Sequence, residues 1–195
     1  MSYKDGTAKI TGKIGESEID QFFKKNGLYF SRPPGLDLGI DRFVSLNSTS
    51  ALKAKIQIKG RRQAGNPRWF QLSITHSQII KALSDKADLN DLWRKKIDMV
   101  DFWILVSIPN QEIWVFPSKI IHEIAKLNYP IYKSRKDNDY SQVHHDKRGN
   151  IAKKQKELNL DIKDLNGITL AERFSFYRNN ITPLLDFLND KNKIN

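Results

Sequence analysis

The chain of 195 residues contains no cysteine. Disulfides and cysteine-ligated zinc sites are therefore excluded, and we expect an intracellular protein. No apolar run approaches the roughly 18 residues that a membrane-spanning helix needs. The first fifteen residues are polar and contain no apolar secretory core. These absences predict a soluble, cytoplasmic protein with no membrane partner.

Acidic residues are also scarce, since 22 Asp and Glu stand against 33 Lys and Arg, which gives a net charge of +11. Such a surplus favours a polyanionic partner, although charge alone leaves open an unrelated basic protein. No serine lies in a nucleophile-elbow pattern, and there is neither a phosphate-cradling glycine loop nor a dinucleotide fingerprint. These absences disfavour serine hydrolases, kinases and dehydrogenases.

Hydrophobic periodicity predicts alternating helices and strands. We expect a loop over residues 11–15, then a helix over 17–26 that Gly27 ends. The same spacing predicts a helical stretch over 75–96 with a break near 85–90. Pro183 is expected in the first turn of the last helix, over 181–188. The remaining expected elements are strands over 28–30, 40–46, 54–59, 69–74, 102–108 and 113–116, and helices over 118–127, 170–177 and 181–188. This order predicts an α/β fold around a mixed sheet.

Polar residues gather on two neighbouring strands of the predicted sheet. Asp41 opens one strand, and Gln57, Ile58 and Lys59 close the next. The carboxylate, the Gln57 amide oxygen and the Ile58 backbone carbonyl are hard ligands for a divalent cation. Lys59 shares a face with Gln57, so its ammonium could orient an attacking water and stabilise charge on a phosphorane. The pattern is suited to a metal-dependent phosphodiesterase.

With these motifs the chain resembles the PD-(D/E)XK nuclease superfamily, which includes many restriction enzymes and Holliday-junction resolvases. The resemblance covers roughly residues 11–127, and it is closer to small uncharacterised bacterial domains with a Gly-Glu helix, a Gly-Ile-Asp strand and a Gln-x-Lys strand. It implies a restriction-endonuclease-like sandwich: a central mixed sheet flanked by helices, with a basic, partly helical C-terminal extension. We accordingly expect a nuclease-like core over 1–132 and a basic segment with C-terminal helices over 133–195.

The resemblance also implies a ligand set. Glu16 stands where the family carries a helix glutamate that completes the metal site, and it is expected to serve a second Mg2+ or its water, with Mn2+ as a substitute metal. Gln57 stands where the family usually has an acid, which weakens metal binding and leaves open an inactive DNA-binding relative. Asp37 competes with Asp41, and Glu18 competes with Glu16 but lies about 200° round the helix. We favour Asp41 and Glu16.

Basic residues follow the second of these strands. Between Lys53 and Trp69 there are six Lys or Arg residues and no acid. A phosphate backbone would pass here, although a solvated loop is the alternative reading. The predicted nucleic-acid-binding residues are Lys55, Arg61, Arg62 and Arg68. Residues 133–156 hold eight Lys or Arg against three Asp, which predicts an exposed basic segment, with 144–146 as a surface loop rather than a metal site.

Together these features predict a Mg2+-dependent DNA endonuclease in restriction, phage defence or a mobile element. The resemblance implies 5′-phosphate and 3′-hydroxyl products, and a homodimer would most simply cut both strands. The alternatives are a junction-resolving nuclease, a catalytically inactive nuclease-fold DNA-binding module, and, less favoured, a basic RNA-binding protein.

Overall fold

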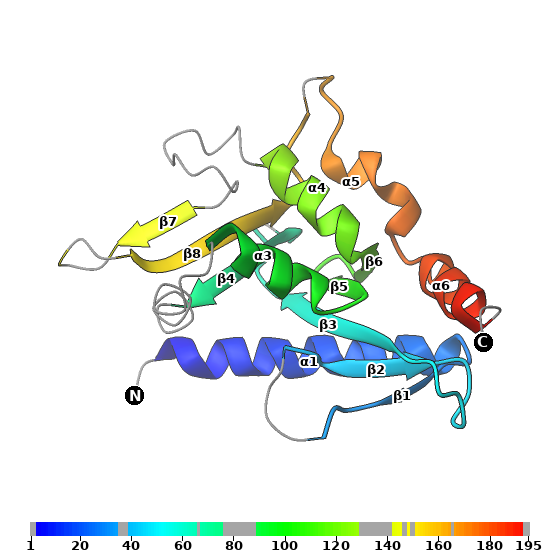
Figure 1. Cartoon of the computed structure of the whole chain (residues 1–195). Helices are drawn as coiled ribbons and strands as arrows, with labels where there is room; N and C mark the ends of the chain where they lie inside the picture. Colours follow the sequence, from blue (N-terminus) through cyan, green and yellow to red (C-terminus); the bar gives the residue numbers. More distant parts are fainter. Residues whose placement is uncertain are drawn as a thin grey trace. The chain divides into compact units, whose positions relative to one another are not determined.

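The computed structural model describes residues 3–34, 39–65, 67–75, 89–128, 142–145, 148, 151–164 and 166–192. The chain is a mixed α/β protein with a central five-stranded mixed sheet and helices, so the expected fold class is confirmed (Figure 1). Packing divides it into two compact units: Met1–Pro67 with Met99–Ser118 and Phe174–Asn195, and Arg68–Asp98 with Lys119–Arg173. The composition-based boundary at residue 132 stays a prediction, because packing within one chain does not show which part folds alone.

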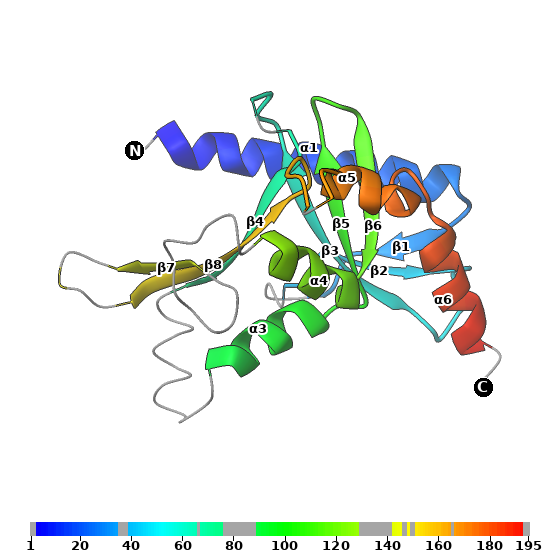
Figure 2. The same ribbon diagram turned by 90° about the horizontal axis from the view of Figure 1, so that it is seen from above.

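The first unit holds the five-stranded sheet, whose order is β1-β2-β3-β5-β6. The β3–β5 pair is parallel and the other pairs are antiparallel, which makes the sheet mixed (Figure 2). The elements of this unit are α1 (Tyr3–Lys25), β1 (Tyr29–Ser31), β2 (Arg42–Ser45), β3 (Ala54–Arg61), β5 (Phe102–Ser107), β6 (Glu112–Pro117), the 3-10 helix η2 (Ser175–Tyr177) and α6 (Thr182–Asn192).

The second unit holds a three-stranded antiparallel sheet of order β4-β8-β7. Its elements are β4 (Trp69–Thr75), α3 (Leu89–Asp98), all but the first residue of α4 (Ser118–Asn128), β7 (Gln142–His145), β8 (Ile151–Asn159) and α5 (Leu170–Arg173). None of the helices in the described ranges is long and apolar enough to cross a membrane.

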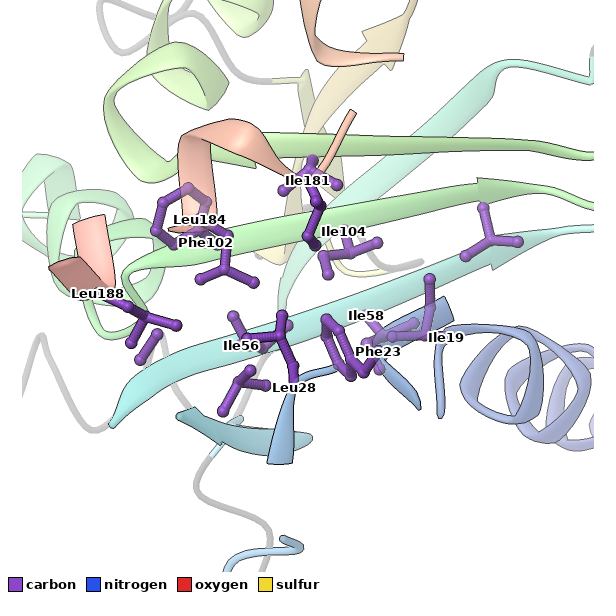
Figure 3. Packing of buried hydrophobic residues seen from close by; sticks show 14 residues of the cluster. Ile19, Phe23, Leu28, Ile56, Ile58, Phe102, Ile104, Ile181, Leu184 and Leu188 are labelled. Carbon is purple, nitrogen blue, oxygen red and sulfur yellow. The ribbon is translucent and has the colours of Figure 1, made fainter. Parts of the chain in front are cut away.

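The core of the first unit is built from helices and strands that each bury one apolar face. On α1, Ile19 and Phe23 are four residues apart and fully buried, so they lie on one side of the helix. They pack in one cluster with Ile56 and Ile58 of β3, and Figure 3 shows these side chains together. The cluster also contains Leu28, Val44, Ala54, Phe102, Ile104, Val106, Val115, Ile181, Leu184 and Leu188. This packing holds α1 against the strand that carries the candidate site.

The predicted helix stop at Gly27 is confirmed. Gly27 has φ +70°, which favours glycine, and its N–H donates to the carbonyl of Lys24 at 3.1 Å. The Leu28 N–H donates to the carbonyl of Phe23 at 3.0 Å, so both bonds of a Schellman motif close the helix.

The loop expected over residues 11–15 is wrong, because α1 continues through this segment from Tyr3. Its two glycines suggested a break, but Gly15 lies where α1 crosses β3. A Cβ on Gly15 would sit 3.3 Å from the Gly60 Cα, and a Cβ on Gly60 would sit 3.0 Å from the Thr11 carbonyl oxygen. Tertiary packing at this crossing outweighs the low helix propensity of glycine.

The glycines of this crossing make a testable contrast in stability. Gly60→Ala places a methyl group against helix backbone that cannot rotate away, so we expect it to lower the free energy of unfolding by about 1–3 kcal/mol. Gly12→Ala meets nothing within 4 Å, and we expect it to raise the free energy of unfolding by about 0.5–1 kcal/mol. Urea unfolding of both variants checks this, and equal effects would contradict the close approach of α1 to β3.

The structure shows strands within residues 133–156, where the sequence analysis expected none. Residues 142–145 form β7 and the segment from residue 151 belongs to β8, while Arg148 is exposed as predicted. His144 and His145 lie in β7, paired with Lys153 and Ile151, rather than in a surface loop. An antiparallel ladder satisfies backbone hydrogen bonds whatever the polarity of the side chains, which composition alone does not reveal.

The remaining predicted elements agree with the structure apart from their bounds. The helix expected over 170–177 is divided into α5 and η2, and Pro183 lies in the first turn of α6 as predicted. From the helical stretch expected over 75–96, α3 accounts for the part after residue 88. Asp37, Asp146, the expected break at 85–88 and residues 133–141, 147 and 149–150 lie outside the described residues.

Candidate functional site

The candidate site lies where β2 begins, beside the middle of β3, inside the first unit. β2 and β3 are antiparallel, with Arg42 opposite Ile56, and the Asp41 N–H donates to the Ile56 carbonyl at 2.8 Å. Asp41 is thereby held beside the middle of β3 just before the ladder starts. Four of the residues predicted from the sequence, Asp41, Gln57, Ile58 and Lys59, are brought together here.

The Asp41 carboxylate receives two hydrogen bonds from β3 on one oxygen. The Gln57 Nε2 donates to Oδ2 at 2.5 Å, and the Ile58 backbone N–H donates to the same oxygen at 2.6 Å. Gln57 is buried, with 8% of its surface exposed, so this contact is shielded from water. The structure therefore places the Asp41 side chain against Gln57 and Ile58, the first two residues of the Gln-x-Lys motif.

Burial disfavours the charged form of Asp41. Burial raises the pKa of Asp41, and the negative charge of Glu16 raises it further. The Ile58 N–H and the positive charges of Lys59 and Arg42 lower the pKa of Asp41 but do not cancel the effect of burial. A cation bound at this carboxylate would compensate the charge that burial makes costly.

The Ile58 carbonyl points toward the same edge of β3 as Asp41. On this strand the carbonyls of Lys55 and Arg61 accept from Asp101 and Ile108, which bracket β5. Residues two apart direct their backbone N–H and C=O groups to the same neighbouring strand. The backbone groups of the odd-numbered residues of β3 therefore point to β5, and those of Ile58 point to the β2 side. The β2 ladder ends at Ile56, and the Ile58 carbonyl lies beyond it beside Asp41.

Lys59 and Glu16 lie at the edges of this arrangement. Lys59 is half-buried, and its positive charge opposes, without cancelling, the rise that burial causes in the pKa of Asp41. The Glu16 carboxylate on α1 lies 3.1 Å from the Arg42 Nη2 and 4.0 Å from the exposed Arg32 Nη2. Glu16 therefore faces an arginine pair rather than contacting Gln57.

Arg42 is the residue that the sequence reading missed. Its side chain is fully buried at 1% exposure, and it contacts Asp20, Glu16 and the backbone of Asp41. A signal was present, because Glu16 and Asp20 are four residues apart on α1 and thus share a helix face. Two acids on one helix face are stabilised by a basic side chain placed between them, but the sequence did not show which of the 33 Lys and Arg residues takes that place.

Glu18, the competitor of Glu16, lines a different part of the surface. It borders an open hollow with Phe22 of α1 and Ile113 of β6, and burial raises the pKa of Glu18. Neither Asp41 nor Gln57 lines this hollow.

The predicted nucleic-acid-binding residues divide between the two units. Lys55 and Arg61 lie on β3 on the same face as Gln57, since they are separated from it by even numbers of residues. Lys55 and Arg62 are exposed, and the Arg61 Nη2 donates to the Gln63 Oε1 at 2.6 Å. Arg68 belongs to the second unit, where its Nη1 pairs with the Asp161 Oδ1 at 2.6 Å. Its charge is thus largely compensated within the protein.

The residues present fit a hard divalent cation. No group of three or more His, Cys, Asp or Glu side chains in the described ranges is placed to hold a metal. Asp41, the Gln57 amide and the Ile58 carbonyl offer oxygen ligands, and Mg2+ commonly retains several waters beside a single carboxylate. The Gln57 amide must turn over for its oxygen to bind, because its nitrogen now faces Asp41.

Gln57→Glu tests this reading of the amide. Without metal, the new carboxylate would face Asp41 where the amide now donates at 2.5 Å, so repulsion should lower the melting temperature in EDTA. With Mg2+, two carboxylates should bind the cation more tightly, and the variant should gain more stability than the wild type. Thermal unfolding with and without Mg2+ checks both arms, and Gln57→Met is a control that offers no oxygen. An equal response of Gln57→Glu and wild type would count against a cation at this position.

Comparison with known proteins adds little to this geometry. No protein-family model matches the chain, and no curated protein matches it. The solved structure of a bacterial homing endonuclease, I-Ssp6803I, is similar to the chain with a TM-score of 0.48 and 13% identity, over 96% of this chain and 99% of that one. At this level of similarity the match decides neither the family nor the function of the chain.

Proposed function

We propose that the protein is a Mg2+-dependent endonuclease that hydrolyses phosphodiester bonds in DNA. The observation that carries the proposal is the meeting of the Asp41 carboxylate with Gln57, Ile58 and Lys59 at one edge of β3. An acid whose charge is disfavoured by burial, two neutral oxygen donors and a nearby ammonium suit phosphodiester hydrolysis. The net charge of +11 fits a polyanionic substrate.

Each residue has a role in this proposal. Asp41, Gln57 and the Ile58 carbonyl would hold Mg2+, and Glu16 would act on a second ion or its water. When bound, Mg2+ supplies Lewis acidity toward the phosphate and makes bound water more acidic. Lys59 would position the attacking water and compensate negative charge as it develops on the phosphate oxygens. Lys55, Arg61 and Arg62 would bind the phosphate backbone, with Arg68 contributing less because of its pair with Asp161.

The finer parts of the proposal come from the PD-(D/E)XK resemblance. They are 5′-phosphate products, a homodimer that cuts both strands, and a role in restriction, phage defence or a mobile element. A junction-resolving nuclease would use the same site on a different substrate. Mn2+ is expected to replace Mg2+, because both accept oxygen ligands.

A catalytically inactive DNA-binding module is the second candidate. Gln57 favours it, because the amide already satisfies Asp41 without a metal. Such a protein would bind DNA with steep salt dependence and show no turnover.

Incubation with supercoiled plasmid and with a four-way junction tests the proposal. Both DNAs are treated with purified protein in Mg2+, in Mn2+ and in EDTA. Cutting in either metal but not in EDTA is the expected result, and discrete bands against junction resolution separate the two kinds of nuclease. Tight, salt-sensitive binding without cutting would replace the proposal with the binding module.

A further inference from the structure

The Arg42 guanidinium joins α1 to the residue that carries the candidate carboxylate. Its Nε donates to the Asp20 Oδ1 at 2.8 Å and its Nη2 to the Asp20 Oδ2 at 3.0 Å, which is a bidentate pair. The same Nη2 lies 3.1 Å from the Glu16 Oε2. On the other side, Nη1 donates to the Asp41 backbone carbonyl at 2.7 Å. One buried side chain therefore contacts two acids of α1, Asp20 and Glu16, and the main chain at Asp41.

Burying the charged Arg42 guanidinium costs free energy, and an apolar side chain at this position would avoid that cost. Burial lowers the pKa of Arg42, but hydrogen bonds and charge from Asp20 and Glu16 outweigh this and raise the pKa overall, so the guanidinium stays charged. Replacing a buried ion pair by apolar residues of similar volume is often neutral or stabilising. Apolar residues could hold α1 on the sheet equally well, so we infer that the charged side chain has a further role.

The geometry of the guanidinium supplies that explanation. Its planar fork holds Asp20 and leaves Nη1 for Asp41, so the main chain at Asp41 is tied to α1. The Asp41 side chain then meets the Ile58 N–H and the Gln57 amide from a fixed backbone. The Glu16 carboxylate is held by the same group, at a set place near the site.

We propose that Arg42 is a positioning residue for the nuclease reaction, fixing both Asp41 and Glu16 through one guanidinium that Asp20 holds in place. The inference rests on the proposed function, because it assigns Arg42 to the same site. Arg42 touches no reacting atom in this role. Partners that orient metal ligands typically affect metal affinity or activity about 10- to 100-fold.

Arg42→Lys is the first test. Lysine keeps the charge but cannot bind Asp20 bidentately while also reaching Asp41 and Glu16. We expect kcat for plasmid cutting to fall about 10- to 100-fold, with the Mg2+ concentration for half-maximal rate raised and the KM for DNA within about threefold. Calorimetric titration with Mg2+ alone should show weaker binding than in the wild type, a readout independent of cutting.

Two further variants keep the test decisive. Asp20→Asn leaves Arg42 in place but weakens its anchor, and we expect the same pattern with a smaller loss, about tenfold. It also decides the question if Arg42→Lys does not fold. Arg32→Lys is the matched control, because Arg32 also faces Glu16, at 4.0 Å, but its side chain is 75% exposed. An exposed pair contributes little, so we expect activity within about twofold of wild type.

The outcomes separate the inference from the proposed function. A wild type that cuts no DNA in Mg2+ or Mn2+ removes the proposed function, and this inference with it. A wild type that cuts, beside folded Arg42→Lys and Asp20→Asn with unchanged kcat and Mg2+ affinity, overturns the inference alone and leaves Arg42 a structural residue. A loss confined to the KM for DNA would also overturn it, because that result assigns Arg42 to substrate binding.

Discussion

Lys59→Ala is expected to abolish metal-dependent DNA cleavage, with kcat reduced at least about 10²- to 10³-fold, while DNA binding stays nearly intact. Removing one preorganised group that stabilises developing charge has an effect of this size in other enzymes. Lys59 shares its face of β3 with Gln57, and its charge lowers the pKa of Asp41, so its loss acts on the site directly. Single-turnover cleavage of plasmid and a binding titration in Ca2+ measure the two effects separately.

The control for this substitution is Lys24→Ala. Lys24 is exposed in the last turn of α1, so the variant loses the same charge away from Asp41. We expect its cleavage rate to match that of the wild type. Should Lys59→Ala cut DNA at the wild-type rate, the assignment of the site would be removed.

Asp41→Asn is expected to move stability and activity in opposite directions. The substitution removes the one carboxylate among Asp41, Gln57 and the Ile58 carbonyl, the ligands proposed to hold Mg2+, so cleavage should fall below detection. It also removes a charge that burial disfavours, while the amide oxygen can still accept from Gln57 and Ile58. The metal-free variant should therefore melt at a higher temperature than the metal-free wild type near pH 7.

The sign of this effect depends on pH. Because the pKa of Asp41 is raised on folding, the folded protein binds this proton more tightly than the unfolded chain does. The contribution of Asp41 to stability is fully present below the unfolded value, about 3.9, and is lost as pH rises through its folded pKa. The gap in melting temperature between Asp41→Asn and wild type in EDTA should thus close as pH falls toward 3.9. A variant that is less stable than the wild type at neutral pH would contradict the cost assigned to this buried charge.

The local parts of the site followed from the sequence because strand geometry is regular. Gln57 and Lys59 are two apart, and that spacing alone puts both side chains on one face of β3. The continuous apolar run at 102–108 predicted a buried strand, and residues 102–107 of it form β5, fully covered on both faces. The contact of Asp41 with Ile58 needed only that the two strands be neighbours.

Longer-range features did not follow in the same way. The glycines of α1 argued for a loop by their propensity, yet Gly15 is buried in a helix because β3 needs a close approach there. No strand was expected over residues 151–156 because of their charge, although β8 pairs with β4 on one side and β7 on the other. Both differences have one cause, because local composition does not report which backbone lies opposite.

The sequence by itself determined the α/β class, the end of α1 at Gly27, and the side of β3 on which Gln57 and Lys59 lie, because turn chemistry and strand period act over a few residues. Only the tertiary structure decided what Arg42 does. Asp20 and Arg42 are 22 positions apart, and their pairing exists because the packing of α1 on the sheet buries the guanidinium where Asp20, Glu16 and the Asp41 carbonyl all reach it. The partners of a buried charge are set by which side chains the fold brings near it, and they cannot be read from the order of residues in the sequence.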